Sequence, residues 1–87
     1  MNSMERRELG KYIVADPKIC HGTPTFKGTR LLVSDVLDMV ADGMDWDAII
    51  RQCHNRITRE AIAEALTVAG LAFQDHASEY LREPVTA

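Results

Sequence analysis

The spacing of apolar residues separates an N-terminal β-favouring part from a longer helical part. Residues 12–15 form a compact β-favouring run. This run stops at Asp16 and Pro17, because the residue before a proline is disfavoured in the helical region. Residues 1–10 are mostly polar, and we expect them to form a flexible lead into the run.

A second β-favouring segment is built around one dipeptide. Residues 24–26 and 29–31 flank Lys27 and Gly28. Two short runs separated by two residues, one of them glycine, predict a tight hairpin in which the glycine takes a positive φ. Strands this short are not stable alone, so we expect them to lie against helices.

The apolar period then lengthens to about three and a half residues, which is typical of helices. We expect a first helix with Ser34 as its N-cap and Gly43 at its C-terminal end. Asp45 is the predicted cap of a second helix and Thr58 of a third, which is the longest and ends before Pro84.

The third helix is apolar on nearly all sides between residues 66 and 73. A helix without a polar face over two turns is usually covered on both sides. A chain of 87 residues buries too little surface to supply both covers, so we expect the second to come from another copy. The expected assembly is a homodimer, with a tetramer left open. The predicted interface residues are Leu66, Val68, Ala69, Leu71 and Phe73.

These elements predict a mainly α-helical fold with a small N-terminal β-hairpin. The three helices have the layout of a helix-turn-helix domain, either homeodomain-like or winged-helix-like. We expect a flexible lead over residues 1–10, one domain with short N-terminal strands over residues 11–75, and a C-terminal extension over residues 76–87. There is no apolar run of membrane-spanning length and no secretory leader, and only two cysteines occur. We therefore expect a soluble cytoplasmic protein without membrane contact.

Charge is segregated along the chain, although the net charge is only −3. Residues 1–30 carry six basic and three acidic side chains, whereas residues 31–50 carry five acidic and no basic ones. One interpretation is an ordinary mixed surface. The other is a protein with separate phosphate-facing and cation-facing surfaces.

Three basic residues are the candidates for DNA contact. In a helix-turn-helix the third helix presents its first turns to the major groove. Lys27, Arg56 and Arg59 are the predicted DNA-binding residues. Glu60 and Glu64 on the same helix would repel phosphates, and three-helix packings without any DNA role are the alternative.

Arg30 follows the turn with Asp16 and Asp35 nearby in sequence. We expect a partly buried bidentate ion pair that joins the hairpin to the first helix, because the guanidinium fork matches a carboxylate. The alternative is a phosphate contact shared with Lys18 and Lys27. The residues predicted to have structural roles at this junction are Gly28, Thr29, Arg30 and Asp35.

Two adjacent Cys-His pairs are the only other chemical candidates. Cys20-His21 and Cys53-His54 contain zinc-binding residue types, but adjacent ligands lack the spacing that lets both side chains reach one ion. Cys53 also falls on an apolar helix face. We therefore expect no metal, no cofactor and no catalytic residues, and a small zinc-dependent enzyme is only the third alternative.

One set of residues forms a pattern that spans the turns and the first helix: Asp16-Pro17, Ile19-Cys20, Gly22, Pro24, Gly28-Thr29-Arg30, Val33, Val36-Leu37 and Gly43. In this pattern the chain resembles a family of small bacterial proteins, the domain of unknown function 433, over roughly residues 11–70. His21 departs from the family pattern, since many members have glycine there.

The resemblance implies a three-helix fold preceded by short strands, and it implies a function. Members resemble antitoxins of type II toxin–antitoxin pairs, encoded beside a PIN-like ribonuclease toxin. Such an antitoxin would dimerise, bind its own operator DNA and cover its toxin. A protein-interaction module that blocks the nuclease without touching DNA is the alternative.

The C-terminal extension is the predicted toxin-binding segment. Tyr80, Leu81 and Arg82 would lie on the toxin, where Arg82 would displace the cation held by the carboxylates of the nuclease. The alternative is that these residues are a frayed terminus.

Overall fold

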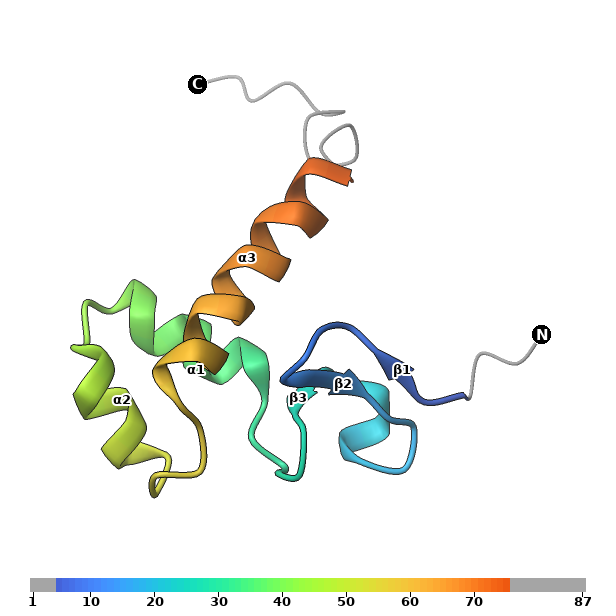
Figure 1. Ribbon diagram of the computed structural model, residues 1–87, viewed down its shortest axis with the longest axis horizontal. Helices are drawn as coiled ribbons and strands as arrows, with labels where there is room; N and C mark the ends of the chain where they lie inside the picture. Colours follow the sequence, from blue (N-terminus) through green and yellow to red (C-terminus); the bar gives the residue numbers. More distant parts are fainter. Residues whose placement is uncertain (1–4, 76–87) are drawn as a thin grey trace.

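The computed structural model describes residues 5–75 (Figure 1). This part of the chain is mainly helical, with a small antiparallel sheet at its N-terminal end, as predicted. The elements in chain order are β1 (Arg7–Glu8), β2 (Ile13–Ala15), the short 3-10 turn η1 (Cys20–Gly22), β3 (Thr25–Phe26), α1 (Val33–Ala41), α2 (Trp46–Gln52) and α3 (Arg59–Asp75).

The sheet has three strands in the order β1-β2-β3, rather than a single hairpin. β1 pairs with β2 in the register Arg7 to Ala15 and Glu8 to Val14. The prediction of a flexible lead over residues 1–10 is therefore wrong at residues 7 and 8. Pairing with β1 satisfies backbone groups of β2 that would otherwise lie along an open sheet edge.

The turn after β3 follows the prediction at its glycine and departs from it in length. Gly28 has a φ of 77°, as the hairpin prediction required. However, the hydrogen bond that closes the hairpin runs from the N–H of Phe26 to the carbonyl of Leu31, at 3.1 Å. The loop therefore spans residues 27–30 rather than the two predicted residues. The hydroxyl of Thr29 bonds within this loop and widens it, donating to the Phe26 carbonyl at 2.8 Å. The returning arm makes only an isolated bridge to β3.

α1 begins two residues earlier than predicted. Its N-cap is Leu32, which is held extended by its bridge to β3, so Ser34 lies inside the first turn. The predicted C-terminal glycine is confirmed, since Gly43 has a φ of 83°. Its N–H donates to Val40 at 2.9 Å, and the next N–H donates to Met39 at 3.1 Å, which together form a Schellman motif.

The other two helix starts lie where the sequence predicts them. Asp45 occupies the N-cap of α2, although its side chain makes no capping hydrogen bond. Thr58 caps α3 through its hydroxyl, which accepts the N–H of Ala61 at 3.2 Å. A hydroxyl cap of this kind stabilises a helix by about 1 kcal/mol.

The hydrophobic core lies where the three helices meet one face of the sheet. Each helix packs against the other two, and α3 also contacts β2. Among the described residues, the largest fully buried apolar side chains are Phe26, Ile13, Ile49, Ile62 and Val36. No helix in residues 5–75 combines the length and apolar character needed to cross a membrane.

α3 is longer than the body it packs against. Ala61, Ile62 and Ala65 are buried in its first half, and Val68 packs at the edge of the same core. Every residue in 69–75 is exposed, and the last turns of α3 extend away from the other elements (Figure 1). The apolar stripe that seats α3 on the core thus continues beyond the core.

Glu64 joins the sheet to α3. Its two carboxylate oxygens accept the backbone N–H groups of Lys11 at 2.8 Å and of Tyr12 at 2.7 Å. The close approach of the Glu64 carboxylate to the loop depends on Gly10, because a Cβ at this position would lie 2.6 Å from the Glu64 carboxyl carbon. The sequence analysis treated Glu64 only as an acid that would repel phosphates, whereas its half-buried carboxylate binds the loop between β1 and β2.

This contact predicts coupled effects of substitution at Gly10 and Glu64. Glu64→Ala removes two hydrogen bonds to a charged acceptor and should lower the free energy of unfolding by about 2–4 kcal/mol. Gly10→Ala should cost about 1–2 kcal/mol, because the added methyl group pushes the carboxylate away from its donors. In the Glu64→Ala background, Gly10→Ala should cost less than about 0.5 kcal/mol.

Urea denaturation of the two single variants and the double variant, all at one protein concentration, measures this cycle. Additive costs would show that Gly10 does not act through Glu64.

Candidate nucleic-acid interface

A recess with only basic charges lies between the sheet, the turn after β3 and the α2–α3 connection. It consists of three hollows of about 100, 490 and 500 Å³, and Arg56 lines all three. Lys11 and Lys27 line the smallest hollow, and Arg30 lines the two larger ones. No aspartate or glutamate lines any of them. We call this site the basic recess and define it by Lys11, Lys27, Arg30 and Arg56.

The four cations of the basic recess differ in how far their charge is already neutralised. Lys27 Nζ lies 3.2 Å from a carboxylate oxygen of Glu8. Hydrogen bonds from Arg6 and then Lys27 hold the pKa of the Glu8 carboxyl below its ordinary value. Lys11 Nζ lies 5.4 Å from the centroid of the Tyr12 ring. The Lys27 charge is thus shared with an acid, whereas Lys11 retains its full charge over an aromatic face.

Arg30 and Arg56 are exposed and make no side-chain hydrogen bond or ion pair within residues 5–75. The predicted ion pair between Arg30 and Asp16 or Asp35 is therefore wrong. Asp16 instead accepts the N–H of Lys18 at 2.9 Å and lies 3.7 Å from Arg6. These nearer donors occupy the carboxylate that Arg30 was expected to use.

The backbone at Arg30 is held firmly on both sides. Gly28 supplies the left-handed turn, and the N–H of Thr29 donates to Phe26 at 3.0 Å. The Thr29 hydroxyl accepts the N–H of Leu31 at 3.0 Å. These contacts agree with the structural roles predicted for Gly28 and Thr29, which stay predictions, while the exposed Arg30 side chain lines the recess.

The backbone at Arg56 is held equally firmly. His54 and Asn55 both have positive φ, at 58° and 60°, and turn the chain sharply after α2. The N–H of Asn55 donates to Ile50 at 2.9 Å, and that of Arg56 to Cys53 at 3.1 Å. The buried residue Ile57 follows, so Arg56 is anchored at the backbone and exposed at its guanidinium.

The structure brings together two of the three predicted DNA-binding residues. Lys27 and Arg56 line the same hollow. Arg59 is used elsewhere, since its Nη1 donates to Asp47 Oδ1 at 2.9 Å and its guanidinium lies 5.3 Å from the centroid of the Trp46 ring. Its position one residue into α3 turns it toward α2 and away from the basic recess.

Sequence reasoning missed Lys11 as part of this site and assigned Arg30 to another role. Lys11 lines the same hollow as Arg56 because the carboxylate of Glu64 binds the β1–β2 loop and holds it against α3. No spacing in the sequence signals that contact. For Arg30 the signal was present, because the phosphate alternative was drawn from the basic residues of the same hairpin.

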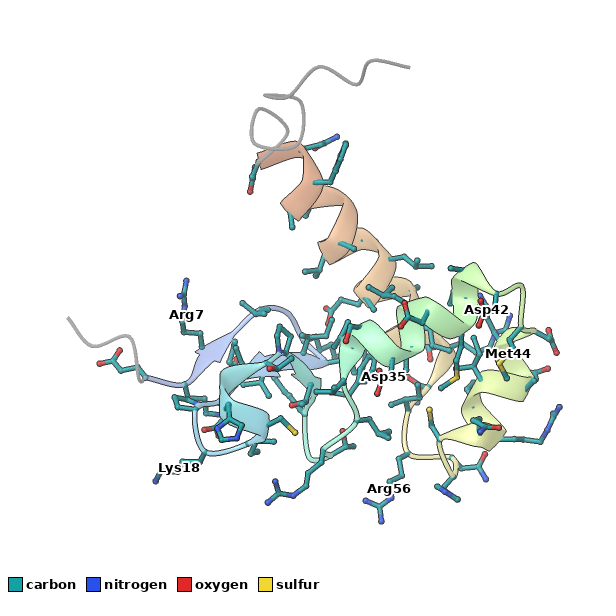
Figure 2. The ribbon with its side chains drawn as sticks, turned by 180° about the vertical axis from the view of Figure 1, so that it is seen from behind. Arg7, Lys18, Asp35, Asp42, Met44 and Arg56 are labelled. Atoms are coloured by element: carbon teal, nitrogen blue, oxygen red, sulfur yellow. The ribbon has the colours of Figure 1, made fainter. Side chains whose placement is uncertain are left out.

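The predicted interface residues of α3 lie at the other end of the molecule. Leu66, Leu71 and Phe73 have exposed fractions of 38%, 55% and 52%, and Ala69 is also exposed. Val68 differs, since it packs against the core of its own chain. Figure 2 shows Arg56 and Lys18 projecting from the edge opposite to the one from which α3 extends. Tyr80, Leu81 and Arg82 lie outside the described residues.

The two Cys-His pairs do not form a common site. Cys53 is buried in the core, and burial followed by the charge of Asp35 raises the pKa of its thiol. Cys20 is half-buried, with its Sγ 3.8 Å from the carbonyl oxygen of Arg30. Within residues 5–75, no three His, Cys, Asp or Glu side chains are grouped so that they could hold a metal ion.

His21 adopts an unusual conformation in η1, where many relatives are expected to have glycine. Cys20, His21 and Gly22 all have positive φ, at 51°, 58° and 86°. A left-handed conformation costs a residue with a side chain roughly 1 kcal/mol, which glycine avoids. The departure at His21 therefore places a side chain at a position whose backbone favours glycine.

Comparison with known proteins finds one family. The family described as "Protein of unknown function (DUF433)" matches residues 13–69, which is about two thirds of the 87-residue chain. No curated protein and no solved structure matches the chain. The matched segment runs from β2 to the point at which α3 leaves the body, so it contains most of the core and three of the four cations of the basic recess. The chain belongs to the DUF433 family.

Proposed function

We propose that this protein is the antitoxin of a type II toxin–antitoxin pair, which neutralises a PIN-like ribonuclease in the cytoplasm and binds its own operator DNA as a homodimer. The antitoxin role rests on the family resemblance. The observation that carries the proposal is the exposed apolar end of α3, which the other elements within residues 5–75 do not cover. Two cysteines without a disulfide are suited to a reducing compartment.

A second copy of the chain is the partner that best fits the end of α3. The exposed residues Ala69 and Leu71 continue a helix that is already anchored in the core. A short helical extension with apolar sides is marginal in water without packing. Two such extensions, related by a two-fold axis, would cover each other, because an isologous contact presents the same patch from both sides.

The basic recess supports the DNA-binding half of the proposal. It gathers cations at the edge opposite to the α3 extension, so a dimer formed through α3 leaves both recesses accessible (Figure 2). Phosphate contacts from a two-fold pair of recesses would give the operator complex its affinity.

The alternative function is a protein-interaction module that blocks the nuclease without DNA contact. Two observations favour it. The first is that Lys27 forms an ion pair with Glu8, and Arg59 forms one with Asp47. The second is that Glu60 adds a negative charge in the first turn of α3. These acidic groups reduce the positive charge of the face that a helix-turn-helix would present to a DNA groove.

A charge placed on the exposed part of α3 should break the dimer. In the proposed dimer, Leu71→Glu would replace one leucine by one carboxylate per subunit at the buried contact. The dissociation constant of the dimer should therefore rise roughly 100-fold or more. Ala63→Glu is the matched control, because it adds the same charge to α3 on an exposed position of the face turned away from the core.

Sedimentation equilibrium measures both variants and the unaltered chain at micromolar concentration. An unaltered chain that sediments as a monomer under these conditions would overturn the dimer.

Substitution of Arg82 tests how the toxin is neutralised. If Arg82 occupies the carboxylate cluster of the nuclease, Arg82→Ala should raise the inhibition constant roughly 30-fold or more, because the buried charge partner is lost. The measurement is RNA cleavage by the nuclease encoded next to this gene, titrated with full-length antitoxin. Arg7→Ala, which removes an exposed arginine from β1, is the control. Undiminished inhibition by Arg82→Ala would eliminate the role of this residue.

Salt dependence separates the two candidate functions. Binding to a duplex from upstream of the gene should weaken steeply with salt, with a log–log slope of about −0.9 for each phosphate neutralised. Four phosphate contacts per dimer would reduce the affinity roughly 100-fold between about 50 and 200 mM salt. Fluorescence anisotropy with a labelled duplex measures this slope. Absence of binding at the lower salt concentration would favour the interaction module.

A further inference from the structure

We propose that Arg30 and Arg56 together hold one phosphate of the DNA backbone in the basic recess, and that this clamp replaces the contact expected from Arg59. The inference rests on the proposed DNA-binding function and assigns the residues that carry it. It places the phosphate between the turn after β3 and the α2–α3 connection, instead of at the first turn of α3.

The side chains of Arg30 and Arg56 have no role within the described fold. Neither makes a hydrogen bond or ion pair within residues 5–75, and both are exposed. An arginine in a structural role is normally paired, because its guanidinium offers five donors in a rigid fork. Two unpaired forks that line the same hollows are therefore available to an external anion.

The backbones of Arg30 and Arg56 are nevertheless held in place, so the two side chains form a defined anion-binding site. Arg30 lies between Thr29, which makes two hydrogen bonds inside the turn, and Leu31, which packs at the edge of the core. Arg56 lies between the left-handed Asn55 and the buried Ile57. Because both arms start from fixed positions, only side-chain freedom is lost when an anion binds.

A phosphodiester group fits the chemistry of this site. The two larger hollows, at about 490 and 500 Å³, share Thr29, Arg30 and Arg56 and have no acidic lining residue. Guanidinium groups bind phosphate oxygens through paired N–H donors. The neighbouring cation Lys11 lines the adjoining hollow and adds positive potential along the path of the backbone.

Arg59 is directed away from the clamp by its own contacts. It bonds Asp47 at 2.9 Å and lies over Trp46, on the α2 side of α3. Its guanidinium would have to leave both partners before it could reach a phosphate. The structure thus separates two arginines that the sequence presents as equivalent, Arg56 and Arg59.

The clamp is tested by the salt slope of DNA binding with the full chain and a labelled duplex from upstream of the gene. Arg30→Ala and Arg56→Ala should each weaken binding roughly tenfold and reduce the slope by about one unit per protomer. The double variant should lose less than the sum of the two changes in log affinity, since both arms hold one phosphate. Arg30→Lys should retain the slope but bind more weakly, because an ammonium lacks the fork.

Two further variants serve as controls. Arg7→Ala removes an exposed arginine whose side chain points away from the edge that carries Arg56 (Figure 2), and Arg59→Ala removes the residue that a helix-turn-helix reading favours. Both should leave the slope unchanged. Thermal unfolding of each variant, measured without DNA, identifies any loss of folding.

The outcomes distinguish a failure of the clamp from a failure of the proposed DNA binding. If the unaltered chain binds DNA with a steep slope and Arg59→Ala reduces that slope while Arg30→Ala does not, the clamp is overturned and DNA binding stands. If the unaltered chain does not bind the duplex at about 50 mM salt, both are overturned. A slope lost equally in Arg7→Ala and Arg30→Ala would show that only overall charge matters and would also overturn the clamp.

Discussion

The architecture depends on the carboxylate of Glu64. Its two hydrogen bonds to the backbone of Lys11 and Tyr12 are the polar connection between the β1–β2 loop and α3, elements that are far apart in the sequence. The contact requires a glycine at position 10, where any side chain would collide with the carboxylate. It aligns β2 over the core and brings Lys11 to the hollow that Arg56 lines. Glu64 on α3 thus helps to form the basic recess, whose charged lining residues are all basic.

The two ends of the molecule have different physical character because α3 is longer than the core that supports it. Its first half is covered by the sheet and the other helices, so Ile62 and Ala65 are buried. Among residues 5–75, no other element covers its second half, although the composition there remains apolar, and Leu71 is about half exposed. At the opposite edge, the connection that contains the left-handed residues His54 and Asn55 holds Arg56 outward (Figure 2). The proposed protein contact at one end and the proposed phosphate contact at the other would therefore not compete for surface.

Several local features were predictable from the sequence because they depend on near neighbours. Gly28 and Gly43 adopt positive φ where a turn and a helix end require it, and Thr58 caps the helix that follows it. The error at Ser34 has a tertiary cause, since the bridge from Leu32 to β3 moves the start of α1. Arg30 was assigned to a carboxylate that Lys18 and Arg6 occupy instead. Such competition among partners cannot be read from spacing.

The sequence by itself determined the class of the fold, the order of its helices and the excess of apolar surface on α3, because periodicity and capping act over a few residues. Only the tertiary structure decided the use of each charge. It turned Glu64 inward, paired Arg59 with Asp47, and placed Arg30 and Arg56 along the same hollow with no ion-pair partner among residues 5–75. The reason is geometric: an ion pair forms or fails within a few ångströms, and folding sets those distances between residues that are far apart along the chain.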